Sequence, residues 1–132
     1  MQALVYEGAG QVRLRDTPLP RAGLDEVLVR VRGVGICGSD LGIFRGEMAA
    51  VQAPLVPGHE FGGWLDNGDF VVVNPMVGCG HCARCQAGRT QVCAQRKVIG
   101  VTRAGACAEF IAVPRRNLLA VPQLSMLQAA LV

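Results

Sequence analysis

Four cysteines lie close together in the sequence: Cys79, Cys82, Cys85 and Cys93. A cysteine thiolate is a soft, charged ligand, and Zn²⁺ accepts four of them in a tetrahedron. The two-residue gaps allow neighbouring thiolates to turn onto one ion, while the seven-residue gap brings Cys93 from the far side. Because all four ligands are cysteines and no position stays open for a substrate, the spacing predicts a structural zinc site.

Three other interpretations of these cysteines compete with zinc. A pair of disulfides is disfavoured, because adjacent Cys-x-x-Cys pairs occur here without a secretory signal. An iron–sulfur cluster matches the first three cysteines, but Cys93 comes too late and no proline follows it. Four unrelated buried thiols are disfavoured by the density of the cluster. A colourless protein carrying zinc would support our prediction, whereas a brown one would indicate an iron–sulfur electron carrier.

A second set of residues with metal-binding chemistry occurs in two glycine-rich segments. A lone cysteine such as Cys37 is most often a small buried hydrophobe, and His59 and Glu60 alone fit a turn or a surface ion pair. Taken together, these residues predict a second metal site, with Cys37 and His59 as ligands and Glu60 as a ligand or nearby base. Asp40 is suited to hold the second nitrogen of His59, and Ser39 offers a hydroxyl for proton transfer.

Short strands are expected to position these residues. Segments 3–6 and 11–16 predict a first hairpin. Segment 26–32 is the clearest strand, because valine recurs at every second position. The Asn67–Gly68 pair predicts a two-residue hairpin turn between apolar runs.

The sequence also predicts two short helical segments and two strands in the second half of the chain. Ser39 or Asp40 is expected to cap a short helix that ends near Phe44. Segments 98–101 and 108–113 predict two strands, and we assign Cys107, which lies between them, to packing. Ser125 and Gln128 have the spacing of a capping box, which predicts a helix start that is cut at residue 132.

Composition places the chain among mainly β proteins. It has 132 residues, 51% hydrophobic, with 17 glycines and 7 prolines, which predicts one turn-rich domain. The net charge of +3 and 5% aromatic content give no basic stripe with interleaved aromatics, so nucleic-acid binding is disfavoured. The sequence has no signal-peptide pattern and no membrane-spanning apolar run. We therefore expect a cytoplasmic protein that contacts no membrane.

The motifs occur in the order found in one enzyme family. The chain resembles the N-terminal, GroES-like catalytic domain of zinc-dependent medium-chain alcohol dehydrogenases, and is closest to their polyol, sorbitol and threonine dehydrogenase branch. In combination the motifs are highly specific, and they cover nearly the whole chain. The matching segments are 35–40, 57–61, 68–71, 79–93, 108–110 and 129–132.

The resemblance implies a fold and a chemistry. The fold is a partly open β-barrel over residues 1–132, with short helices and a structural zinc lobe at about 76–97. Cys37 and His59 would hold a catalytic zinc, with Glu60 in or near its ligand set and Ser39 at the start of a proton path. In such enzymes zinc is a Lewis acid that assists hydride transfer from an alcohol to NAD(P).

Three departures from the family pattern shape our expectations. Gly42 stands where many relatives have a histidine, and the link over 63–68 is shorter than in most. The nucleotide-binding domain is absent, and so is the glutamate ligand that follows the 129–132 motif in polyol-type relatives. We therefore expect a fragment or an engineered minimised domain, inactive alone, that binds about one zinc firmly.

Two further expectations concern function and partners. The main hypothesis is an enzyme domain whose full-length parent oxidises a small alcohol or polyol. The alternative is a non-enzymatic zinc-binding scaffold or interaction module. Apolar surface exposed by truncation is expected to favour homo-oligomers.

Overall fold

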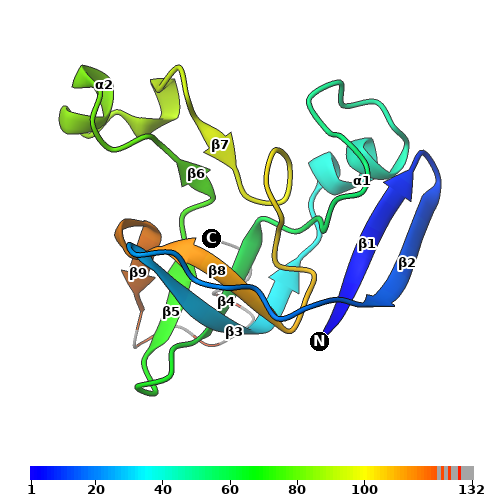
Figure 1. Ribbon diagram of the computed structural model, residues 1–132, viewed down its shortest axis with the longest axis horizontal. Helices are drawn as coiled ribbons and strands as arrows, with labels where there is room; N and C mark the ends of the chain where they lie inside the picture. Colours follow the sequence, from blue (N-terminus) through cyan, green and yellow to red (C-terminus); the bar gives the residue numbers. More distant parts are fainter. Residues whose placement is uncertain (122, 124, 126–127, 129–132) are drawn as a thin grey trace.

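A curled antiparallel sheet forms the body of the computed structural model, which describes residues 1–121, 123, 125 and 128 (Figure 1). Its strand order is β8-β3-β4-β5-β9. The expected mainly β, partly open barrel is therefore confirmed. The five strands are β3 (Glu26–Gly35), β4 (Glu60–Trp64), β5 (Phe70–Val73), β8 (Phe110–Pro114) and β9 (Leu118–Ala120).

A separate hairpin flanks this sheet. It consists of β1 (Gln2–Gly8) and β2 (Gln11–Asp16), which pair antiparallel as predicted. Bridges from Ala3 to Ala108 and from Tyr6 to Leu55 attach β1 to the body. The hairpin therefore lies beside the short helix α1 (Gly38–Phe44), on the right of Figure 1.

Residues 76–98, which we call the cysteine lobe, project from the other side of the body (Figure 1). Two short strands pair to form its stem, and two short helices lie beyond them. The stem is held at its base by Asn117, whose side-chain amide donates to the carbonyls of Asn74 and Met76 at 2.7 and 3.0 Å. The lobe elements are β6 (Met76–Val77), α2 (Ala83–Gln86), η1 (Thr90–Val92) and β7 (Lys97–Val98).

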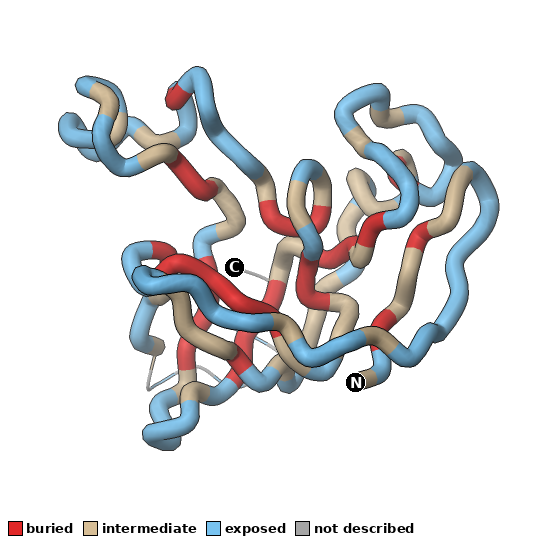
Figure 2. The backbone as a smooth tube through the Cα atoms, viewed as in Figure 1, coloured by how far each residue is buried: buried red, intermediate tan, exposed pale blue. Residues whose placement is uncertain are grey.

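The core lies inside the curled sheet. Alternating residues of β3, β5 and β8 point into it, which is why valine at every second position forms a strand here. Figure 2 shows buried backbone concentrated in the sheet strands, with exposed residues along β2 and much of the lobe. The main buried cluster contains Val29, Phe61, Val71, Val73, Val77, Ile99, Ala106, Ile111 and Val113.

The connection between β4 and β5 differs from the prediction in length. The hairpin is present, but five residues connect the strands instead of two. The Leu65 amide donates to the Asp69 carbonyl at 2.9 Å, and only Gly68 in this turn has a positive φ, of 88°. A type I′ turn needs positive φ at both central residues, and Asn67 does not adopt it.

The second half of the chain also departs in part from expectation. The strand predicted over 98–101 is wrong, since β7 ends at Val98 and residues 99–107 form a loop that is buried near both ends and exposed at Thr102 and Ala104. The strand predicted over 108–113 is confirmed as β8, which begins at Phe110 and ends at Pro114. Ser125 and Gln128 form the predicted reciprocal bonds, at 2.9 Å from the Ser125 amide and 3.4 Å to the Ser125 hydroxyl. The rest of that predicted helix lies outside the described residues.

Helices in the described part of the chain are all short. The longest is α1, with seven residues. None of them has the length and apolar character needed to cross a bilayer.

An ion pair links β3 to the 99–107 loop and predicts a pH dependence of the stability of the fold. Arg103 donates to the Glu26 carboxylate at 3.0 Å and to the Ala112 carbonyl at 2.9 Å. Burial works to raise the pKa of Glu26, but the Gly23 amide and the Arg103 guanidinium outweigh it, so the pKa lies below its usual value of 4.5. The stabilisation is therefore present above pH 4.5 and is lost as the pH falls through the folded-state pKa.

We expect Glu26→Gln to lower the free energy of unfolding at neutral pH by about 1 kcal/mol, as for loss of a charged hydrogen bond. The difference from the wild-type chain should shrink as the pH falls below 4.5. Urea unfolding across the acid range measures it, with the exposed Glu47→Gln as control. A difference that is constant with pH would contradict this role for the pair.

Two candidate metal centres

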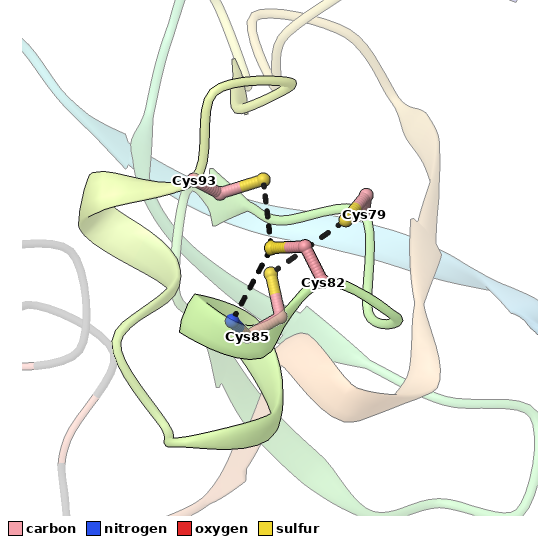
Figure 3. Close-up of side chains that lie close together, drawn as sticks. All are labelled: Cys79, Cys82, Cys85 and Cys93. Atoms are coloured by element: carbon pink, nitrogen blue, oxygen red, sulfur yellow. Dashed lines mark hydrogen bonds between the residues drawn. The ribbon is translucent and has the colours of Figure 1, made fainter.

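Three short elements, β6, α2 and η1, place the four lobe cysteines. Cys79 follows β6, Cys82 caps the N-terminus of α2, Cys85 lies within α2, and Cys93 ends η1. The Cys85 amide donates to the Cys82 sulfur at 3.5 Å, so α2 turns both side chains to one side. The four side chains point toward a common centre (Figure 3).

The sulfur positions fit a tetrahedral ion. The Cys79 and Cys85 sulfurs are 3.9 Å apart, as are those of Cys82 and Cys93. All four sulfurs lie within 4.8 Å of one another. A zinc–sulfur distance of about 2.3 Å corresponds to a sulfur–sulfur separation of about 3.8 Å in a tetrahedron. The predicted set is therefore brought together with the separation that this ion requires.

The thiol pKa values within the lobe diverge. Backbone amides of His81 and Cys82 lower the pKa of Cys79 to about 6. The Gly80 amide lowers that of Cys85, but burial and the neighbouring sulfurs outweigh it and raise the pKa to about 11. Thiols this close cannot all ionise without a compensating cation. The donor set therefore fits a divalent ion, which would hold all four as thiolates.

The second group is organised by the N-terminus of α1. The prediction of a helix here is confirmed, but the predicted cap is wrong: Cys37 is the N-cap, and Ser39 and Asp40 already belong to the helix. Asp40 instead reaches back, and its Oδ2 accepts the Cys37 amide at 2.9 Å. This contact fixes Cys37 relative to the helix.

Cys37, Ser39 and His59 meet although His59 comes from a different segment. The Cys37 sulfur is 3.1 Å from His59 Nε2 and 2.7 Å from Ser39 Oγ. Ser39 Oγ is also 3.2 Å from Nε2. A tetrahedral zinc needs about 3.6 Å between a sulfur and a nitrogen ligand. Cys37 and His59 would therefore have to separate by about half an ångström on binding.

Asp40 faces the other side of the imidazole. Its Oδ1 lies 3.6 Å from His59 Nδ1, and both atoms are buried without a hydrogen-bond partner. A carboxylate in this place favours the tautomer with its proton on Nδ1, which leaves Nε2 free to bind a metal. Asp40 thus lies at Nδ1 of the imidazole, while Nε2 faces the Cys37 sulfur.

Glu60 stands apart from this arrangement. The residues whose ligand atoms lie within 4.8 Å of one another are Cys37, Asp40 and His59. Glu60 is half-buried at the start of β4, paired with Gly35. Its role as a ligand or base stays a prediction.

Sequence reasoning missed the residues that hold these groups in place. Asn117 is buried and anchors the lobe stem, but a single asparagine gives no sequence signal. Arg116 donates to the Gly78 carbonyl at 2.8 Å, next to the first lobe cysteine. Cys107 lies in neither group, and burial, helped by the charge of Asp40, raises the pKa of its thiol to about 11.

Comparison with known proteins identifies the same family. The L-threonine 3-dehydrogenase of Mesorhizobium japonicum is 35% identical over 92% of this chain and 40% of its own length. A short-chain alcohol dehydrogenase (rspB) from Escherichia coli CFT073, solved with its cofactor NADH, is 34% identical with a TM-score of 0.92. It matches 99% of this chain and 41% of the solved one.

A second similar structure is the cobalt- and zinc-bound thermostable alcohol dehydrogenase from Pyrobaculum aerophilum. It is 33% identical, with a TM-score of 0.89, over 98% of this chain and 44% of that one. The chain thus spans about 40% of the length of its curated relatives. The profile of the alcohol dehydrogenase GroES-like domain matches residues 23–123. The chain therefore belongs to the alcohol dehydrogenase family through its GroES-like domain.

Proposed function

We propose that this chain is the zinc-binding catalytic domain of an NAD(P)-dependent dehydrogenase that oxidises an alcohol or polyol. The observation that carries the proposal is the meeting of Cys37, Ser39 and His59 within 3.2 Å, with Asp40 behind the imidazole. A scaffold has no use for this set, whereas metal-assisted alcohol oxidation needs each member. Similarity to L-threonine 3-dehydrogenases and alcohol dehydrogenases supports the substrate class.

The two metal centres have separate roles in this proposal. The closed tetrathiolate of the lobe is structural, because its four ligands leave no open position. Cys37 and His59 leave room for a substrate oxygen, and Glu60 is the proposed additional ligand or base. The site has fewer preformed ligands and a short sulfur–nitrogen distance, so its ion is the weaker of the two.

The chain's own residues would bind and orient the alcohol. A zinc ion at Cys37 and His59 would supply Lewis acidity toward the alcohol oxygen. Ser39 lies beside both ligands and is only half-buried, so its hydroxyl can accept the alcohol proton while donating its own proton to solvent water. Asp40 holds the Cys37 amide through one oxygen and aims His59 with the other, so the ligand geometry persists as the charge changes.

The cysteines also bear on the proposed cellular setting. All six are free thiols in the structure. Zinc thiolates persist where disulfides do not form, which supports our proposal of a reducing, cytoplasmic location.

Hydride transfer also needs a nicotinamide held against the reacting carbon. We therefore expect these 132 residues, mixed with NAD(P)⁺ and a panel of alcohols and polyols, to form no reduced cofactor at 340 nm. The same residues joined to the nucleotide-binding part of an rspB-type relative should turn over at least one secondary alcohol. Zinc retained in the lobe without turnover by that longer protein would favour a scaffold and contradict the enzyme.

A further inference from the structure

The position of His59 is set by the residue before it. Gly58 is buried and has a φ of 96°, which side-chain-bearing residues rarely adopt. A Cβ atom there would lie 2.8 Å from the Cys107 sulfur and 2.9 Å from its amide nitrogen. Gly58 therefore leaves no room for a side chain between itself and the loop that contains Cys107.

That loop, residues 99–107, follows the segment before His59 closely. Three consecutive backbone amides of the loop donate hydrogen bonds to carbonyl oxygens of the segment before His59. Gly105 donates to Val56 at 2.7 Å, Ala106 to Gly58 at 2.9 Å, and Cys107 to Pro57 at 2.9 Å. In Figure 1 this loop runs between β7 and β8, in the middle of the molecule.

Two glycines make the contact possible. A Cβ on Gly105 would meet the carbonyl oxygens of Gly58 and Pro57, both at 2.4 Å. A Cβ on Gly100 would meet the Gly58 oxygen at 2.6 Å. Both glycines are buried, and the atoms they face are backbone atoms that no side-chain rotation can move. Gly105 is the better position for a substitution, because Gly100 also has a positive φ, which would add backbone strain to the steric effect.

The loop is fixed on its other side. Ile99 is fully buried in the main core. Arg103 holds the Glu26 carboxylate and the Ala112 carbonyl. A Cβ on Gly105 would also lie 2.6 Å from the Gly100 Cα atom. Its closest contacts are with Pro57 and Gly58, which continue directly into His59, so extra volume at Gly105 should displace that segment.

We propose that Gly100 and Gly105 are positioning residues for His59, and that their backbone contact with Gly58 sets the distance from its imidazole to Cys37. The functional consequence rests on the second metal site proposed above. A Cβ on Gly105 needs about 1 Å more clearance than it has. That displacement is about twice the half-ångström adjustment that Cys37 and His59 would make on binding a metal, so the second site should weaken while the lobe site stays intact.

The test compares the wild-type chain with Gly105→Ala and with Val113→Ala, a buried core change on β8 that controls for lost stability. With the lobe loaded with zinc, Co²⁺ is titrated and the affinity of the Cys37–His59 site is read from its visible absorption. We expect Gly105→Ala to weaken cobalt binding by about 10–100-fold, as when groups that orient a ligand are altered. Val113→Ala should leave the affinity unchanged.

A metal-free readout separates the two proposals. The chain has two histidines, so the ring resonances of His59 are followed by NMR with those of His81 as internal reference. Gly105→Ala should shift the His59 resonances alone. Cobalt affinity and His59 resonances that match the wild type would overturn the positioning role. A wild-type chain without cobalt binding at this site would overturn the proposed function, and the NMR shift would still decide the positioning role.

Discussion

Replacing Cys82 with serine is expected to release the zinc of the cysteine lobe and to unfold the lobe. Its helices have four and three residues, too short for independent stability. Val77 and Cys93 are its main buried side chains, so little apolar burial replaces the ion. Binding of a structural zinc accounts for about 10 kcal/mol or more in small zinc domains, and most of that should be lost.

Zinc analysis and urea unfolding would measure this change. Cys107→Ser is the matched control, since Cys107 is a free thiol outside both candidate metal groups. It should keep its zinc and unfold near the wild-type urea concentration. A Cys82→Ser protein that retains a full equivalent of zinc and wild-type stability would contradict the structural role.

Replacing His59 with alanine should have the opposite profile. The variant should remain folded, because His59 is only partly buried, contacts the polar groups of Cys37, Ser39 and Asp40, and belongs to neither hydrophobic cluster. It should lose the second metal ion, and in the longer protein that carries the nucleotide-binding part it should lose about 10³-fold in kcat/KM. That factor corresponds to the several kcal/mol that a Lewis acid contributes to an alcohol oxidation.

His81→Ala provides the matched control for this variant. His81 is exposed in the lobe, and its Nδ1 lies 3.0 Å from the Cys79 carbonyl oxygen. It should retain activity and both ions. If His59→Ala destabilised the chain more than Cys82→Ser does, the division into a structural and a catalytic centre would be wrong.

Local sequence signals explain which parts of the fold could be predicted. The alternating valines of β3 and the spacing of the lobe cysteines are properties of neighbouring residues. The strand is confirmed, and the four sulfurs lie within 4.8 Å of one another. The pairing of Cys37 with His59 is a contact between distant segments; it is inferred from ligand chemistry in two glycine-rich segments, and the family resemblance supports it. The cap of α1 was misplaced, because a cysteine N-cap is uncommon and depends on Asp40 reaching back from the first turn.

The 99–107 loop could not be predicted from local sequence signals either, for a different reason. Segment 98–101 has the apolar composition of a strand, but Gly100 adopts a φ of 76° and the chain turns there. The contact of Gly100 and Gly105 with Gly58 leaves no pattern in composition or periodicity. It is visible only when the three backbones are placed together.

We propose that two unlike metal centres occupy one small barrel, a closed tetrathiolate in the lobe and an open site at Cys37 and His59. Metal analysis of the purified chain before and after dialysis against a mild chelator distinguishes them. We predict about one zinc per chain that survives dialysis, and a second that is removed and can be restored by added Zn²⁺. A chain that loses all its zinc together, or that contains iron instead, would contradict the account.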